Sequence, residues 1–236
     1  MQIGHETYDD QWMNENMMGP NALRMAEELT QPMALRPGMR VLDLGCGRGL
    51  TSVFLARAYG VQVFATDLWI AASDNWARFC AQGLADAIVP IHADAQELPF
   101  ASDYFDAIIC VDAYHYFGQS DTYFDQKLVP LCKAGGEIGL AFPGRRAGFE
   151  AGIPQALLGN WTAEDLKAIR SSAWWEKRLR SERIETLDIQ EMACTDAAWD
   201  DWLNSGNPHA ANDRHNLQVG MGQWLNLLAV RARKRI

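Results

Sequence analysis

The sequence is poor in the features that tie a protein to a membrane or to nucleic acid. No apolar run in its 236 residues approaches the ~18 to 20 residues that span a bilayer. The N-terminal stretch MQIGHETYDD lacks the charged and apolar regions of a signal peptide. Positive charge is scarce as well, because 21 Lys and Arg face 30 Asp and Glu, a net charge of −9. We therefore expect a cytoplasmic protein without nucleic-acid partners or stable membrane association.

Cysteine and histidine are too scattered to build a disulfide framework or a metal site. The chain has five cysteines, an odd number, with no C-x-x-C pair and no pair of histidines nearby. Neither disulfide bonding nor zinc binding is expected, and we predict no metal. The cysteines are Cys46, Cys80, Cys110, Cys132 and Cys194.

The chain does contain a regular alternation of two patterns. Continuous apolar runs typical of buried strands are followed by segments whose apolar residues recur at helical spacing. The predicted strands cover 39–45, 61–67, 88–94, 106–113, 137–143, 184–193 and 223–234. The predicted helices cover 50–60, 70–83, 121–131, 161–180 and 195–203, and another begins at Pro20. This order indicates an α/β fold with a doubly wound, mostly parallel seven-stranded sheet and additional helical elements.

Two of these helices carry more detailed expectations. The one after the second strand is predicted to place Trp69, Trp76 and Phe79 on roughly one face. The segment 161–180 is predicted to form a single helix that begins at Thr162 with a capping box.

A glycine-rich turn, VLDLGCGRGL, follows the first predicted strand and begins the first predicted helix. In a doubly wound sheet, ligands bind at the carboxyl ends of the strands, and glycine lets the backbone approach them closely. Dinucleotides are bound through G-x-G-x-x-G, and S-adenosylmethionine through D-x-G-x-G-x-G. Here Asp43 precedes Gly45, Gly47 and Gly49, and Leu50 stands where the dinucleotide pattern needs its third glycine. The pattern favours S-adenosylmethionine.

Residues 36–143 resemble the class I S-adenosylmethionine-dependent methyltransferases, with a Rossmann-like fold. VLDLGCGRG is similar to the first motif of that family, and VFATD, HADAQELPF, FDAIICVDAYHYF and LCKAGGEIGLAF resemble its later strand ends. The resemblance implies that Asp67 binds the ribose hydroxyls, that Asp94 accepts from the adenine amino group and that Ala95 meets the ring. Ala134 replaces the usual proline of the turn before the fifth strand.

The resemblance thus implies one cofactor, S-adenosyl-L-methionine, and a set of binding residues. These are Asp43, Gly45, Cys46, Gly47, Gly49, Asp67, Leu68, Asp94, Ala95 and Asp112. Asp112 is expected to meet the methionine ammonium. From the residues alone two simpler roles stay open, because Asp67 could cap the following helix and Asp94 could cap a turn.

The sequence DAYHYF after the fourth strand contains the candidate general base. His115 is flanked by Tyr114 and Tyr116, and an imidazole near its unperturbed pKa of ~6.5 is suited to accepting a proton at neutral pH. The alternative is that His115 only lines the pocket or begins the next helix.

The N-terminal 35 residues are a candidate lid. The helix from Pro20 is predicted to bury Ala22, Met25, Ala26 and Leu29. Ahead of it lie two aromatic side chains that either close over the cofactor or pack against the sheet, namely Tyr8 and Trp12.

The acceptor pocket is expected to include the insertion after the fifth strand. Arg145 and Trp161, with the neighbouring Arg146, suit an aromatic, a carboxylate or a cationic amine, and the sequence does not choose among them. We expect methyl transfer to a small molecule by in-line displacement. The similarity extends to the ubiquinone-biosynthesis and cyclopropane-synthase branches, so a lipid-modifying enzyme stays open, as does a non-catalytic cofactor-binding protein. A nucleotide-linked oxidoreductase is disfavoured by Leu50 and Asp94.

The chain is expected to form a single domain over 1–236, and a homodimer is left open. Its expected parts are a lid over 1–35, a cofactor-binding core over 36–143, a substrate-side insertion over 144–183 and C-terminal elements over 184–236.

Overall fold

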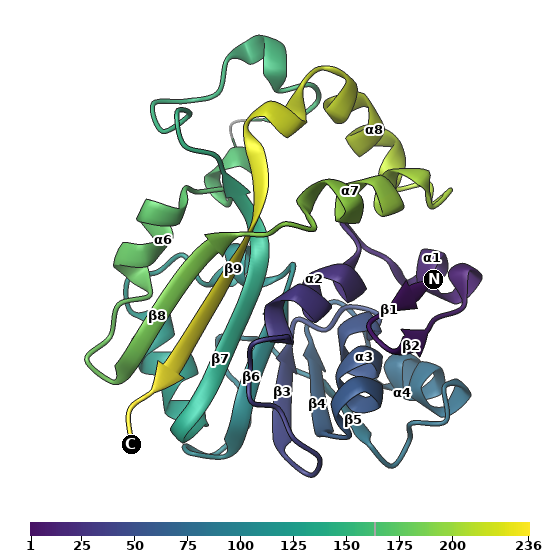
Figure 1. Ribbon diagram of the computed structural model, residues 1–236, viewed down its shortest axis with the longest axis vertical. Coiled ribbons are helices and arrows are strands. Elements are labelled where there is room, and N and C mark those ends of the chain that lie inside the picture. Colours follow the sequence, from purple (N-terminus) through teal and green to yellow (C-terminus); the bar gives the residue numbers. More distant parts are fainter. Residues whose placement is uncertain (163) are drawn as a thin grey trace.

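The computed structural model describes residues 1–162 and 164–236 and contains the predicted sheet. Within these residues, seven strands form one sheet in the order β5-β4-β3-β6-β7-β9-β8 (Figure 1). Their bounds are β3 Arg40–Leu44, β4 Gln62–Asp67, β5 Ile88–His92, β6 Phe105–Val111, β7 Cys132–Arg145, β8 Ile184–Glu191 and β9 Leu225–Lys234. The first five run parallel, and β9 is antiparallel to both β7 and β8. The predicted fold class is confirmed.

The order of the strands creates a crevice beside β3. From β3 the chain moves outward through β4 and β5, then returns to the other side of β3 for β6 and β7. The connections that follow β3 and β6 therefore lead away from the gap between these two strands in opposite directions. Ligands of doubly wound sheets bind at such a point, outside the carboxyl ends of the strands.

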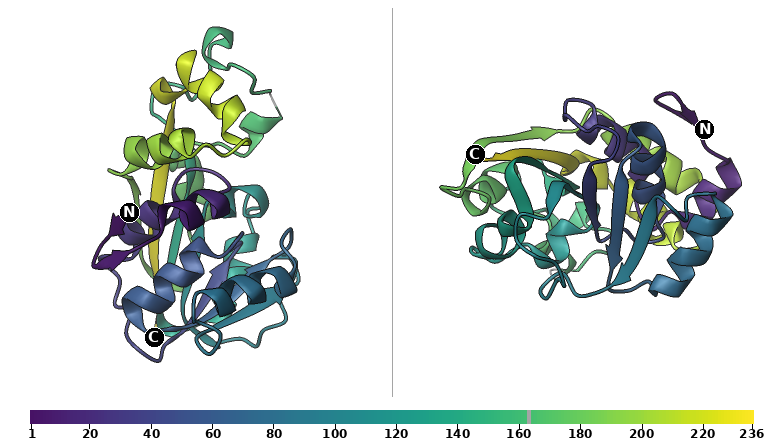
Figure 2. Two further views of the ribbon diagram at one scale, coloured as in Figure 1. Left: turned by 90° about the vertical axis from the view of Figure 1, so that its right-hand side faces the viewer. Right: turned by 90° about the horizontal axis from the view of Figure 1, so that it is seen from below.

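Helices cover both sides of the sheet and lie above one of its ends. Their bounds are α1 Asp10–Asn16, α2 Ala22–Thr30, α3 Leu50–Tyr59, α4 Ala72–Ala81, α5 Tyr114–Phe117, α6 Ser172–Arg178, α7 Thr195–Asn204 and α8 Ala210–Gln218. The helices expected over 50–60, 70–83 and 195–203 and after Pro20 are confirmed. α8 was not expected from the sequence, and α7 and α8 lie beyond the carboxyl ends of the parallel strands (Figures 1 and 2).

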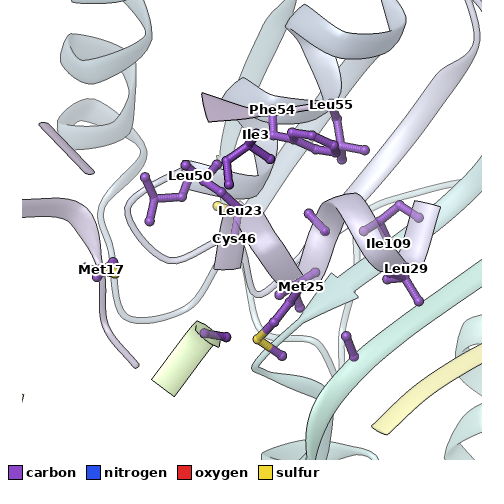
Figure 3. Packing of buried hydrophobic residues seen from close by; sticks show 14 of the residues in the cluster. Ile3, Met17, Leu23, Met25, Leu29, Cys46, Leu50, Phe54, Leu55 and Ile109 are labelled. Atoms are coloured by element: carbon purple, nitrogen blue, oxygen red, sulfur yellow. The ribbon is translucent and has the colours of Figure 1, made fainter. Parts of the chain in front are cut away.

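The N-terminal segment is part of the core. The short strands β1 (Gln2–Ile3) and β2 (Glu6–Thr7) pair with each other, and Ile3 packs beside Phe54 and Leu55 of α3 (Figure 3). On α2, Met25, Ala26 and Leu29 are fully buried as expected, whereas Ala22 is only partly buried. Burial of this apolar face stabilises α2, because the hydrophobic effect contributes roughly 25 cal/mol per Å² of apolar surface removed from water.

Two predicted helices are wrong in detail. The segment 121–131 forms a π-helical turn over Phe124–Leu128 and a 3-10 turn over Val129–Leu131. Pro130 lies in the latter, where its missing N–H prevents a regular α-helix.

The segment 161–180 is not one helix either. Thr162 and Asp165 do form the reciprocal bonds of a capping box, at 2.7 and 3.3 Å, but only a 3-10 turn follows. The regular helix is α6, whose first turn is capped instead by Ser171. Ala163, inside the predicted helix, lies outside the described residues.

The expected aromatic face of α4 is also wrong. Phe79 is fully buried, but Trp76 is 46% exposed and Trp69, which precedes the helix, is 67% exposed. Asn75 shares the buried side with Phe79, since it donates to the Gly47 carbonyl at 2.9 Å. The side of the helix that carries Asn75 and Phe79 therefore faces the glycine loop, and Trp76 is exposed to solvent.

None of the helices in residues 1–162 and 164–236 combines the length and apolar character needed to cross a membrane. No cluster of three or more His, Cys, Asp or Glu side chains in this part of the chain is arranged to hold a metal ion.

Candidate active site

A cavity of about 310 Å³ lies at the carboxyl ends of β3, β4, β5 and β6. Its wall combines the glycine loop with the N-terminal segment 16–20. Eight of the predicted cofactor-binding residues line it: Gly45, Cys46, Gly47, Asp67, Leu68, Asp94, Ala95 and Asp112. The structure thus brings together residues from four successive strand ends.

The N–H groups of the glycine loop donate hydrogen bonds to the end of the adjacent strand β4. The N–H groups of Gly45 and Cys46 donate to the Thr66 carbonyl at 2.8 and 3.1 Å, and the Gly47 N–H donates to Asp67 Oδ2 at 2.8 Å. Gly45 has φ +72°, and a side chain there would overlap the Cβ of Ala113. Close packing of two backbone segments at the cavity floor therefore requires glycine at this position.

Asp43 and Gly49 do not line the cavity, which corrects the expectation for both. Gly49 has φ +86° and caps α3, and a Cβ on it would lie 2.8 Å from Cζ of Phe79. Its missing side chain makes room for α4 and not for a ligand. Asp43 is fully buried beneath the loop and accepts from Ser52 Oγ at 2.6 Å, and burial raises its pKa to about 7.

Asp94 shows the turn-capping role that the sequence left open, whereas Asp67 caps the turn before α4 and not the helix itself, whose N-cap residue makes no side-chain hydrogen bond. Asp67 Oδ1 accepts from the N–H groups of Trp69 and Ile70 at 2.7 and 2.9 Å, and Asp94 Oδ1 accepts from the Gln96 N–H at 2.8 Å. A carboxylate oxygen has two acceptor positions. Oδ2 of Asp67 therefore keeps one acceptor position, and Oδ2 of Asp94 has no protein donor among the hydrogen bonds of the described chain.

Asp112 is the strained residue of the site. Its φ of +56° is unusual for a residue with a side chain, and such strain clusters at functional sites. Its carboxylate lies against Gly19, where a Cβ would overlap Oδ2. Burial, and then the charge of Asp213, raises the pKa of Asp112 to about 8. The carboxyl is therefore poised to ionise when a cation approaches it.

A second cavity of about 350 Å³ adjoins the first. The two share five lining residues: Met18, Gly19, Pro20, Asp112 and Tyr116. The remaining wall comes from segments far apart in the sequence: His115, Pro143, Asn160, Trp161, Asp165, Ala168, Ile169, Trp199, Asn212, Asp213 and Asn216. Two molecules bound in these cavities would meet beside Asp112.

His115 lines the second cavity but does not have the expected pKa. Its side chain is 3% exposed, and Nδ1 has no hydrogen-bond partner. Burial lowers the pKa of His115 to about 3, because the imidazolium would be desolvated. The imidazole is neutral at pH 7 and a weak base, so the expectation of an unperturbed pKa is wrong.

Of the residues expected around the substrate, Tyr116 and Trp161 line the second cavity, and others lie elsewhere. Tyr114 is fully buried between Phe142 and Trp175, at centroid distances of 5.9 and 5.7 Å, and belongs to the core.

The two aromatic residues of the expected lid and Arg145 lie outside both cavities. Tyr8 is buried with its ring 5.8 Å from the Arg57 guanidinium, and Trp12 stacks on it at 6.3 Å. Arg145 donates to the Leu166 carbonyl at 3.4 Å. Within the lid expected over 1–35, the segment 16–20 lines the first cavity.

Sequence reasoning missed several lining residues. Thr66 has a buried hydroxyl without a partner at the edge of the first cavity, and Arg48 donates to the Glu15 carbonyl at 2.6 Å, which ties the glycine loop to α1. Thr66 directly precedes Asp67 and Arg48 stands within the glycine motif, so position could have indicated both. Asp213 carries no such local signal, because only tertiary packing of α8 brings it to the second cavity.

Comparison with known proteins shows that part of the chain is similar to methyltransferases. Residues 41–136 match the family described as a methyltransferase domain. Methyltransferase GfsG of Streptomyces halstedii is 30% identical over 123 residues, which is 50% of this chain and 42% of GfsG. The cyclopropane-fatty-acyl-phospholipid synthase of Escherichia coli K12 is 33% identical over 107 residues, 43% of this chain and 26% of the synthase. The matched part thus spans less than half the length of either relative.

A solved structure shares the whole fold. The geranyl diphosphate C-methyltransferase of Streptomyces coelicolor, in complex with S-adenosyl-L-homocysteine, superimposes with a TM-score of 0.73. The alignment covers 98% of this chain and 83% of that protein at 15% identity. The methyltransferase fold expected from the sequence is thereby confirmed.

Proposed function

We propose, on the premise that residues 41–136 belong to the methyltransferase domain family, that the protein transfers a methyl group from S-adenosylmethionine to a small-molecule acceptor. The observation that carries the proposal is the first cavity, where Asp67, Asp94 and Asp112 stand at the ends of β4, β5 and β6. This cavity lies at the point where doubly wound sheets bind their ligands.

The chemistry of these residues fits the cofactor. S-adenosylmethionine presents hydrogen-bond donors and positive charge in its ribose hydroxyls, adenine amino group and methionine ammonium. The cavity presents acceptors with free positions, on Oδ2 of Asp67 and of Asp94, and the carboxyl of Asp112. In the proposal, Asp67 binds the ribose, Asp94 and Ala95 the adenine, and Asp112 the ammonium.

The rest of the site would position the reactants. The sulfonium group supplies a methyl carbon that is already activated, so alignment of the acceptor with it provides a large part of the rate. Met17, Met18 and Pro20 line the first cavity and would shield a bound cofactor from water, and Asp112 and Tyr116 form the wall that both reactants would share. The low pKa of His115 favours a reaction that needs no strong base.

Calorimetric titration with S-adenosylmethionine, S-adenosylhomocysteine and NAD tests the cofactor. Micromolar binding of the first two and none of NAD is expected, and failure of both to bind would refute the proposal. Binding without release of S-adenosylhomocysteine from any acceptor would favour the non-catalytic alternative.

A pair of variants tests whether the cofactor binds at Asp67. Asp67→Ala removes a buried acceptor, which should weaken S-adenosylhomocysteine binding by ~1 to 3 kcal/mol. Asp86→Ala, at an exposed turn outside the cavity, is the control and should leave the affinity unchanged. Unchanged affinity in Asp67→Ala would remove the ribose assignment.

A further inference from the structure

The second cavity is lined by acidic side chains and not by Lys or Arg within the described residues. Its three carboxylates are those of Asp112, Asp165 and Asp213. None of the three forms an ion pair within the described chain. Asp165 is exposed and accepts hydrogen bonds from Thr162, whereas Asp112 and Asp213 are half-buried and desolvation favours their protonated forms. None of the described lining residues is a cation that would offset a negative charge on these two carboxyls, so a bound cation would stabilise their ionised forms.

Asp213, which comes from α8, lines the second cavity and not the first. Asp165 does so as well, but Asp213 is half-buried and Asp165 is exposed. Trp202 Nε1 donates to Oδ2 of Asp213 at 2.8 Å, which fixes the carboxylate and leaves Oδ1 free. Burial raises the pKa of Asp213, as it does for Asp112, so each carboxyl would gain stability from a nearby cation.

The other walls suit an organic cation. Trp161, Trp199 and Tyr116 present aromatic rings to this cavity, and aromatic faces attract ammonium groups. His115, nine-tenths or more buried, lines the same space with an unpartnered Nδ1. Because its imidazole is neutral, it adds no opposing positive charge.

We infer that the second cavity binds the methyl acceptor as an amine that is protonated in solution, and that its nitrogen receives the methyl group. The inference rests on the proposed methyl transfer and specifies its substrate class. Acidic acceptors are disfavoured because neither of the two arginines that could bind a carboxylate, Arg145 and Arg146, lines this cavity. Arg145 bonds to the Leu166 carbonyl, and Arg146 pairs with Glu191 at 2.8 Å.

Methyl transfer to an amine acceptor balances in bonds, protons and charge. A primary or secondary ammonium first gives one proton to a cavity carboxylate, which passes it to solvent. The freed nitrogen lone pair then forms the N–C bond while the C–S bond breaks, and the electron pair of that bond stays on sulfur as a neutral thioether. The product is an ammonium with one more methyl group, and it leaves with the charge that the entering ammonium had.

A pair of probes with the same shape and different charge tests the inference. Choline and its neutral isostere 3,3-dimethylbutan-1-ol are titrated into the unmodified protein saturated with S-adenosylhomocysteine. We expect choline to bind at least about tenfold more tightly, from cation–aromatic and carboxylate contacts. Equal affinity, tighter binding of the alcohol, or no detectable choline binding would overturn the inference.

The variant Asp213→Asn assigns the preference to this cavity. It should reduce choline affinity by about tenfold or more, since it removes a buried charged partner, and leave the alcohol and S-adenosylhomocysteine affinities unchanged. Asp200→Asn, an exposed position on α7 outside both cavities, is the matched control and should change none of the three. Equal choline affinity in both variants would contradict the assignment to Asp213.

A turnover assay separates this inference from the proposed function. With 2-phenylethylamine, 2-phenylethanol and phenylacetate as acceptors of one carbon frame, only the amine should release S-adenosylhomocysteine. Release from the alcohol or acid alone would overturn the amine assignment and leave methyl transfer intact. Absence of S-adenosylhomocysteine binding in the calorimeter would instead overturn the proposed function itself.

Discussion

The two cavities lie side by side, but the chain builds them in different ways. The first is lined mainly by residues at the ends of consecutive strands, where a short motif places several of them at once. The second takes its distinctive groups from the segment 160–169 and from α7 and α8. The comparison teaches that the first cavity depends on local motifs and the second on long-range packing. Four predictions test this contrast, from the largest effect to the smallest.

Gly49→Ala should show that part of the motif serves folding. The added methyl would overlap the Phe79 ring in a left-handed backbone, and we expect a loss of ~2 to 5 kcal/mol in the free energy of unfolding, measured in urea. Gly83→Ala is the control, because Gly83 has φ +70° with nothing within 4 Å of a Cβ. It should cost only ~1 to 2 kcal/mol for the backbone. Equal losses would refute the packing role.

Asp112→Asn tests the residue that the two cavities share. Asparagine tolerates the left-handed backbone, so the fold is kept while the charge is lost. We expect S-adenosylmethionine to bind ~1.5 to 3 kcal/mol more weakly in calorimetry, the range for a hydrogen bond to a charged group. Asp103→Asn, at the other non-glycine residue with positive φ, 55°, should leave the affinity unchanged. A similar loss in both variants would point to backbone strain.

The same carboxyl should make the free protein less stable as pH rises. With its pKa near 8 when folded and 3.8 when unfolded, Asp112 binds a proton in the folded state that the unfolded state has released. Stability is therefore lost as pH rises toward 8. From pH 6.5 to 8 the unfolding free energy should fall by ~1 to 2 kcal/mol more in wild type than in Asp112→Asn. Asp43 contributes in the same direction to both proteins and cancels, and parallel curves would contradict the raised pKa.

His115→Gln should have the smallest effect. Because its pKa is near 3, His115 is protonated only in strong acid, and kcat for an amine acceptor should fall by less than about tenfold. The pH profile of kcat should keep its shape between pH 6 and 7. A loss of ~100-fold or more, the range for a general base, would restore the catalytic role expected from the sequence.

Most of the fold was predictable because strand and helix periods are local properties. All seven strands of the large sheet were anticipated, whereas the two-residue strands β1 and β2 were not. The end of α3 at Gly60 follows from the left-handed backbone of that residue, φ +63°. The failures have local causes too. Pro130 breaks the helix expected over 121–131, and a capping box at Thr162 starts only one turn, since the chain leaves the helical path before Ser171.

The candidate site was predictable only where the residues that line it are placed by neighbouring residues in the sequence. Tyr114 and Tyr116 look equivalent in sequence, yet one is in the core and the other at both cavities. A short helix such as α5 sends neighbours in different directions, and only the surrounding packing decides which of them is buried. Tyr8 shows the same limit, because its burial depends on the contact of the N-terminal segment with α3.

The sequence by itself determined the order of strands and helices, the glycine turn and the acidic residues at three strand ends, because each depends on neighbouring residues. Tertiary structure alone decided the rest. It made Gly49 a packing position, lowered the pKa of His115 by burial, and brought Asp213 on α8 toward Asp112 at the end of β6. Burial and electrostatic contact are properties of distances between remote segments, and those distances exist only once the chain has folded.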